Sequence, residues 1–436
     1  MKKLQLVYGM ITALLCALVF HLEAQIPKAK TGTFALTHAT IETVTKGTIT
    51  DGTVVISHGK ITDVGTNVQL PAGADVIDCK GLFIYPGMID GGTNLGMSEI
   101  GSDPRTQDFN EIGDVIPQMS ALTAVNPNAV AIPITRVSGI TTVLASPQGD
   151  LYSGTAALIN LHGYTPEQMY AGFQGVTLNF PNTGRRGFWD RRTDEEIKKA
   201  ADNAMKRMSE VWDRAVQYQK IDSATKGKAG YYPEMQALLP VVKGERPLLI
   251  EANAAKDIQS ALKWIKEKKI KNVILTGVSE GWRVADEIAK AKIPVITGGV
   301  LELPTREYDR YDQAYANAGQ MFKAGVKVAI RSGETNNQNY RNLPYHAGFA
   351  VAYGMDKTEA LKAITIVPAE IFGVADKIGS IETGKVANLF VCDGDPFETK
   401  TQIKQVFIDG WQIPLVSRQT QLYDEFLKRE PGVSKK

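Results

Sequence analysis

The middle of the chain alternates short β-branched runs with amphipathic stretches of helical period, and this alternation restricts the fold more than any other feature. Such a repeat is typical of βα units that build a parallel sheet. The repeat length favours a barrel over a sandwich. The predicted strands are residues 139–144, 273–275, 294–297 and 327–330, and the predicted helices include residues 257–268 and 284–290.

Both ends of the chain differ from this middle, because they consist of short strand-like runs separated by turn signals. We expect the ends to pair into one composite β-sandwich domain, from residues 25–85 and 378–415. The barrel then spans residues 86–377, and a C-terminal helix and tail occupy residues 416–436. A helical insertion at about residues 181–244 interrupts the barrel; its charged helix starts at a Thr193/Glu196 capping-box pattern and ends near Gln219.

The first residues read as an export signal. Lys2 and Lys3 precede an apolar run from about residue 4 to residue 20, and Ala24 ends a region suited to cleavage. We therefore expect residues 1–24 to be a signal peptide and the mature protein to be periplasmic or secreted. An uncleaved membrane anchor and lipid attachment at Cys16 are the alternatives.

The charge of the chain argues against nucleic-acid binding, and its cysteine content says little about function. The net charge of +2 comes from 49 basic and 47 acidic residues spread evenly, so no basic patch favours nucleic acid. The expected partner is a small-molecule substrate or ligand. Beyond the signal region only Cys79 and Cys392 remain, either as one disulfide or, as we prefer, as two buried thiols.

Several stretches, taken together and in order, resemble the amidohydrolase superfamily, and within it the imidazolonepropionase-like and secreted prolidase-like members. They are residues 85–90 (Tyr-Pro-Gly-Met-Ile-Asp), 139–143, 359–373, 379–389 and 393–396. The resemblance implies a (β/α)8 TIM-like barrel on a small composite β-sandwich, dimeric assembly, and hydrolysis of a C–N bond in a small substrate.

The resemblance also implies where metal ligands would lie, since two imidazoles at alternate positions of a strand can hold one ion. This chain has none of the usual residues there. The first strand has Gly92 and Asn94 in place of a His-x-His pair, the fifth has Asn253, the sixth has Gly277, and the eighth has Gly333 in place of aspartate. No lysine occurs in the candidate third and fourth strands that could act as a bridging ligand.

A histidine count points the same way. Of the five histidines, His21 lies in the signal region, and His38 and His58 lie in the β domain. Only His162 and His346 remain for the barrel, too few for the usual site. We therefore expect no standard zinc site, and we leave the cofactor open.

Polar residues at the vacated positions are the candidate site. Glu251 and Glu334 are the candidate catalytic residues, each able to act as general base if burial raised its pKa. Candidate ligand-binding residues are Asn94, Asn253, Arg306, Tyr311, Arg341 and His346. For Arg306 and Tyr311, the alternative is that they belong to a salt-bridged loop. For the positions that lack the usual metal ligands, the alternative is that polar side chains simply fill an inactive cavity.

Three functions stay open on the sequence, of which the weakest is a surface-binding module for peptides or glycans, because the composition marks no aromatic binding platform; the other two are favoured. One is an exported hydrolase with a non-standard site. The other is a catalytically inactive homologue that binds a ligand, or that pairs with an intact amidohydrolase paralogue; a homo-oligomer or such a heteromer is expected.

Overall fold

The computed structural model describes residues 28–185, 190–333 and 339–429. The predicted signal peptide lies outside these residues. Within the described ranges, no helix combines the length and the apolar character needed to cross a bilayer.

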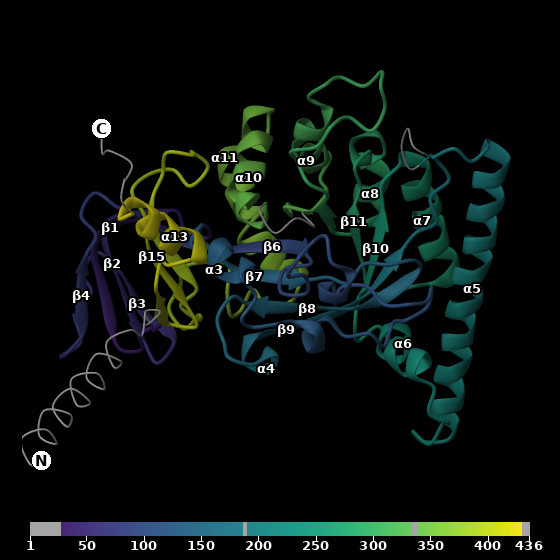
Figure 1. Cartoon of the computed structure of the whole chain (residues 1–436), viewed down its shortest axis with the longest axis horizontal. Helices are drawn as coiled ribbons and strands as arrows, with labels where there is room; N and C mark the ends of the chain where they lie inside the picture. The colour runs from purple at the N-terminus through teal and green to yellow at the C-terminus, as the bar shows by residue number, and fades with distance from the viewer. Residues whose placement is uncertain (1–27, 186–189, 334–338, 430–436) are drawn as a thin grey trace, which may run out of the picture.

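Strands from both chain ends form one eight-stranded sheet, in the order β16-β15-β14-β5-β1-β2-β3, with β4 also pairing with β1. The junction is the antiparallel pair of β14 and β5, which registers Phe390 with Tyr85. The sheet has its own apolar core, and Figure 1 shows its purple and yellow strands together at one end of the molecule. Its strands are β1 Phe34–Glu42, β2 Thr48–Ser57, β3 Lys60–Gly65, β4 Asp75–Asp78, β5 Phe83–Pro86, β14 Leu389–Cys392, β15 Ile403–Ile408 and β16 Trp411–Ile413.

The middle of the chain forms a second eight-stranded sheet, in the order β13-β12-β11-β10-β9-β8-β7-β6, which curls into a nearly closed barrel. Between β13 and β6 the gap is bridged by backbone hydrogen bonds from Ile330 N to Ala363 O (2.9 Å) and from Ile89 N to Ile364 O (2.8 Å). The strands are β6 Met88–Thr93, β7 Ile140–Ala145, β8 Tyr152–Asn160, β9 Tyr170–Asn179, β10 Leu248–Ala252, β11 Val273–Gly277, β12 Val295–Thr297 and β13 Val328–Ala329.

These two sheets confirm the predicted fold class, with one difference. Strand β8 runs antiparallel to both of its neighbours, β7 and β9. The connections on either side of β8 are too short for the crossover, usually helical, that a parallel pair requires. Residues 140–179 therefore form a meander inside an otherwise parallel barrel.

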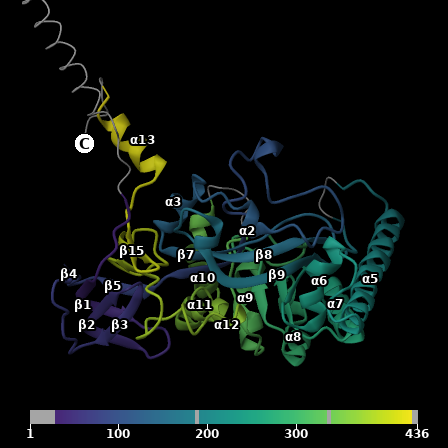
Figure 2. The ribbon, with the colours of Figure 1, turned by 90° about the horizontal axis from the view of Figure 1, so that it is seen from below.

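Helices cover the barrel and fill the insertion. The capping box predicted at Thr193 is present, and the helix it starts, α5, runs on to Ala224, beyond the predicted end near Gln219. The helix α5 lies at the far end of the molecule from the composite domain (Figure 1), and α13 extends away from that domain (Figure 2). The α-helices are α2 Ala121–Ala124, α3 Ala131–Arg136, α4 Pro166–Met169, α5 Asp194–Ala224, α6 Pro233–Lys243, α7 Ala255–Lys268, α8 Ala285–Ala291, α9 Gln313–Lys323, α10 Leu343–Ala352, α11 Lys357–Lys362, α12 Ile366–Ile371 and α13 Arg418–Leu427; short 3-10 turns are Pro104–Thr106, Gly281–Arg283 and Tyr340–Asn342.

The two cysteines are both buried and free. Burial raises the pKa of the Cys79 thiol to about 11 and that of the Cys392 thiol to about 12. Both thiols are therefore protonated at neutral pH and behave as small apolar groups.

A polar network joins the composite domain to the barrel. Asn160, at the end of β8, donates to both carboxylate oxygens of Asp409 at 2.9 and 3.0 Å. Its own oxygen accepts from Thr142 at 2.8 Å and from Asn388 at 3.0 Å. Burial raises the pKa of Asp409, so this carboxylate depends on the hydrogen bonds from Asn160.

We predict that Asn160→Ala lowers the free energy of unfolding by roughly 2 kcal/mol, because it leaves the partly buried carboxylate of Asp409 without its side-chain donor. Denaturant titration measures the change. The matched control is Asn272→Ala, whose side chain is exposed and whose effect should stay within about 0.5 kcal/mol. Equal losses in the two variants would contradict a role for Asn160 in joining the domains.

Candidate functional site

The site is formed by alternate residues of the barrel strands, whose side chains point to the same side. Leu249 and Ile274 lie opposite each other in β10 and β11 and belong to an apolar cluster together with residues of β6, β12 and β13. Two residues further on, Glu251 and Thr276 are again paired and point the same way. Polar side chains thus lie directly above the apolar layer, at the carboxyl ends of the strands, where sites of such barrels form.

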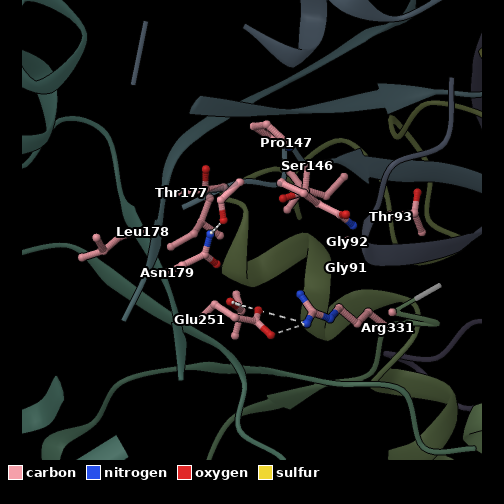
Figure 3. A pocket seen from close by; sticks show the side chains of 16 residues that line it. Gly91, Gly92, Thr93, Ser146, Pro147, Thr177, Leu178, Asn179, Glu251 and Arg331 are labelled. Carbon is pink, nitrogen blue, oxygen red and sulfur yellow. Dashed lines mark hydrogen bonds and ion pairs between the residues drawn. The ribbon is translucent and has the colours of Figure 1, made fainter. Parts of the chain in front are cut away.

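An ion pair between Glu251 and Arg331 lies at the centre of this polar layer (Figure 3). Arg331 follows Ala329 of β13 by two residues, and its Nη2 donates to the two Glu251 oxygens at 2.9 and 3.0 Å. Thr276 donates to Glu251 Oε2 at 2.7 Å, and Asn253 donates to Oε1 at 3.3 Å. The Glu251 carboxylate is therefore bound by donors on both oxygens.

The balance of charge keeps Glu251 ionised. Burial by itself raises the pKa of this carboxyl, but the Arg331 charge and the hydrogen bonds outweigh burial and hold the pKa below its usual value. The sequence analysis made Glu251 a general base on the condition that burial raises its pKa, and this condition is not met. The physical reason is the neighbouring guanidinium.

Three hollows meet at Glu251. One of about 350 Å³ has polar walls that include Ser146, Thr177 and Asn179. A second of about 260 Å³ includes Asn253 and Ser279 and has an apolar wall, formed by Trp282, Leu303 and Ala318. A third of about 670 Å³ opens towards α5. Glu251 lines all three, and Arg331 lines the first two, so a ligand in the mouth would contact the pair.

The residues at the expected metal positions do not fit a His/Asp metal site. A side chain at Gly277 would begin 2.4 Å from both Glu251 Oε1 and Asn253 Oδ1. Asn94 is fully buried and accepts a hydrogen bond from the Tyr340 hydroxyl, outside the three hollows. Among the described residues, no three His, Cys, Asp or Glu side chains come together in a way that could hold a metal ion.

The other predicted ligand-binding residues do not meet at one point. Arg306 forms an ion pair with Glu280, donating from Nη2 to Oε2 at 2.7 Å, and Glu280 in turn accepts the N–H of Ala255 at the start of α7. This arrangement matches the salt-bridged-loop alternative for Arg306. Tyr311 and Arg341 have exposed side chains that line none of the three hollows.

His346 is buried in α10 and holds a loop in place. Its Nδ1 accepts the backbone N–H of Val300 at 2.9 Å and of Leu301 at 3.3 Å, just after β12. Burial lowers its pKa to about 4, so the ring is neutral. Instead of the predicted ligand contact, the structure gives His346 a role in positioning the second hollow's wall. Glu334 lies outside the described residues.

Sequence reasoning missed Arg331, which lines the mouth, and Asp90, which supports the segment that carries Arg331. The strand period could have identified Arg331, because it lies two residues beyond Ala329 on the inward face. Asp90, on β6, is buried and accepts the N–H of Gly92 and of Ser332, each at 3.2 Å. It joins β6 to the segment after β13, and burial raises its pKa to about 6.

A nearly closed barrel joined to a composite β domain, with a pocket at the strand ends, is the architecture of the amidohydrolase fold. The chain belongs to the amidohydrolase superfamily.

Comparisons with known proteins support this assignment. The family model described as Amidohydrolase family matches residues 251–413. Amidohydrolase tasK of Hapsidospora irregularis is 21% identical over 390 residues, covering 82% of this chain but only 39% of that protein. An imidazolonepropionase of Sphingopyxis alaskensis is 23% identical over 385 residues, covering 81% of this chain and 89% of that protein. The solved structure of an amidohydrolase from Thermotoga maritima MSB8 matches with a TM-score of 0.77 and 25% identity, over 88% of this chain and 100% of that chain.

The raised pKa of Asp90 predicts a specific pH dependence. The folded state favours the protonated acid, so this stabilisation is present below the ordinary pKa of 3.8 and is lost as the pH rises through about 6. Asp90→Asn cannot ionise, so it avoids this loss of stability, and its side-chain oxygen can still accept the N–H groups of Gly92 and Ser332. We expect the stability of the variant relative to wild type to rise between pH 4 and pH 7, by up to roughly 3 kcal/mol.

Denaturant titrations of both proteins across this pH range test the prediction. Asp202→Asn, at an exposed position on α5, controls for the change of charge. Wild-type and Asp90→Asn curves that stay parallel from pH 4 to pH 7 would show that Asp90 does not titrate there.

Proposed function

We propose that this chain is an exported hydrolase that acts on a C–N bond of a small peptide-like or other amide compound, through a site without the usual His/Asp metal ligands. The observation that carries the proposal is the convergence of three hollows on Glu251, two of them also lined by Arg331, at the carboxyl ends of the barrel strands. The names of the relatives, among them imidazolonepropionases and a deaminase, support a hydrolytic class.

The chemistry follows from the two charged groups. Glu251 is ionised, so its carboxylate can take a proton from water that attacks the amide carbon and can return that proton to the leaving nitrogen as the C–N bond breaks. The Arg331 guanidinium lines the same hollows and can donate to the carbonyl oxygen as negative charge develops on it. Because the pKa of Glu251 is lowered, this carboxylate is a weak base, and we expect slow turnover.

A second function is favoured by one observation. The donors from Arg331, Thr276 and Asn253 occupy both oxygens of Glu251, as expected for a structural carboxylate. On this alternative the chain is an inactive homologue that binds a small ligand in the mouth, or that pairs with an amidohydrolase retaining His-x-His. A homo-oligomer or this heteromer is the assembly we propose.

We predict that Glu251→Gln lowers hydrolysis by at least about 100-fold, since it removes the proton acceptor. Purified wild-type protein and the variant are incubated with N-acyl amino acids and cyclic amides, and mass spectrometry follows the released amine or opened ring. Glu267→Gln, an exposed change on α7, is the matched control and should keep wild-type activity. Glu334→Gln tests the second predicted carboxylate in the same assay.

Full activity in both Glu251→Gln and Glu334→Gln would overturn these catalytic roles. Absence of turnover by wild type, together with co-purification of an amidohydrolase that retains His-x-His, would instead support the inactive alternative.

A further inference from the structure

Four of the five positions at which the family resemblance places metal ligands surround the Glu251–Arg331 pair: Gly92, Asn253, Gly277 and Gly333. A Cβ built at Gly92 would lie 3.4 Å from Arg331 Cδ and 3.5 Å from its Nη1, and one at Gly333 would lie 3.7 Å from its Nε. On the other side, Asn253 donates to Glu251 at 3.3 Å. Positions that would carry metal-binding side chains in a standard site therefore enclose a guanidinium and its carboxylate in this chain.

We propose that the guanidinium of Arg331 is a built-in cation that takes the place of the metal in the barrel mouth, and that Gly92 and Gly277 are the small residues that make room for the ion pair. The proposal concerns the charge balance of the pocket floor. It holds whether the chain hydrolyses a substrate or only binds one.

Electrostatics explains why such a cation is needed. Glu251 is partly buried in a mouth built on an apolar layer, where an unpaired carboxylate is destabilising. Arginine suits the place because its guanidinium is planar, stays charged and can contact both oxygens of one carboxylate. The Nε of Arg331 has no hydrogen-bond partner among the described residues, as expected if charge compensation, more than a full set of hydrogen bonds, holds this side chain.

Steric limits show that the glycines and the ion pair depend on each other. Gly277 has a φ of +79°, a left-handed conformation that side chains disfavour, and its Cβ would overlap the Glu251 carboxylate at 2.4 Å. A Cβ at Gly92 would lie at ordinary contact distance from the guanidinium, 3.5 Å from Nη1, so a larger side chain there would share this space with Arg331. An imidazole at position 277 is incompatible with the pair as it stands.

The proposal predicts a new binding property. Arg331→Ala removes the cation, leaves Glu251 unpaired and opens a space shaped by a guanidinium group. Guanidinium chloride at millimolar concentration should then bind there. We expect the thermal unfolding midpoint of Arg331→Ala to lie several degrees below wild type and to rise saturably with guanidinium, relative to sodium chloride at equal ionic strength.

Matched variants make the rescue specific. The double variant Arg331→Ala/Glu251→Gln lacks the carboxylate and should not respond. Neither should wild type, whose site is filled, nor Arg310→Ala, which loses an exposed arginine paired with Asp312. Isothermal titration calorimetry of the same proteins measures the binding directly.

Failure of guanidinium to raise the midpoint of Arg331→Ala, or an equal rise in the double variant, would overturn the proposal. If Arg331→Ala does not fold, Arg331→Lys and Arg331→Met provide a second test. The lysine variant keeps the positive charge and should have a higher unfolding midpoint than the methionine variant. Adding Glu251→Gln to the methionine variant should restore part of the lost midpoint. Equal midpoints for Lys and Met would show that the positive charge at this position is not required.

Discussion

A carboxylate that points into the mouth of an apolar barrel needs a positive charge beside it, and in this chain Arg331 supplies that charge to Glu251. The surrounding residues fit this requirement. Thr276 and Asn253 complete the hydrogen bonds to Glu251, and glycine at positions 92 and 277 leaves space for the pair. The hollows of the mouth are arranged around it, so the ion pair sets both the shape and the charge of the pocket.

The barrel holds this pair in position through strands and loops that are themselves fixed. Parallel register places Glu251 beside Thr276, and Asp90 joins β6 to the segment that carries Arg331. On the rim, His346 holds the loop after β12, and the Arg306–Glu280 pair ties the next loop to the start of α7. Charged groups that seem free in the sequence are thus part of the support of the pocket.

The sequence predicted the fold class because hydrophobic period and turn signals are local. The β-rich ends, the alternating middle and the capping box at Thr193 are all of this kind. The reversal of β8 was not predicted, since the direction of a strand depends on the length of its connections, and the meander was read as part of the alternation. Among the predicted site residues, Glu251 and Asn253 line the hollows of the mouth, and their roles stay predictions. The partner of Arg331 is not evident from local sequence, because its long side chain reaches a carboxylate that lies 80 residues away in the chain.

If Arg331 stands in for a metal ion in the barrel mouth, the protein should not retain zinc there. The sharpest test is the zinc content of the purified wild-type protein, measured by elemental analysis after saturation with zinc and desalting. We expect zinc well below one ion per chain. One retained zinc ion per chain, lost on Glu251→Gln, would contradict this expectation, because the carboxylate would then be holding a metal and not the guanidinium.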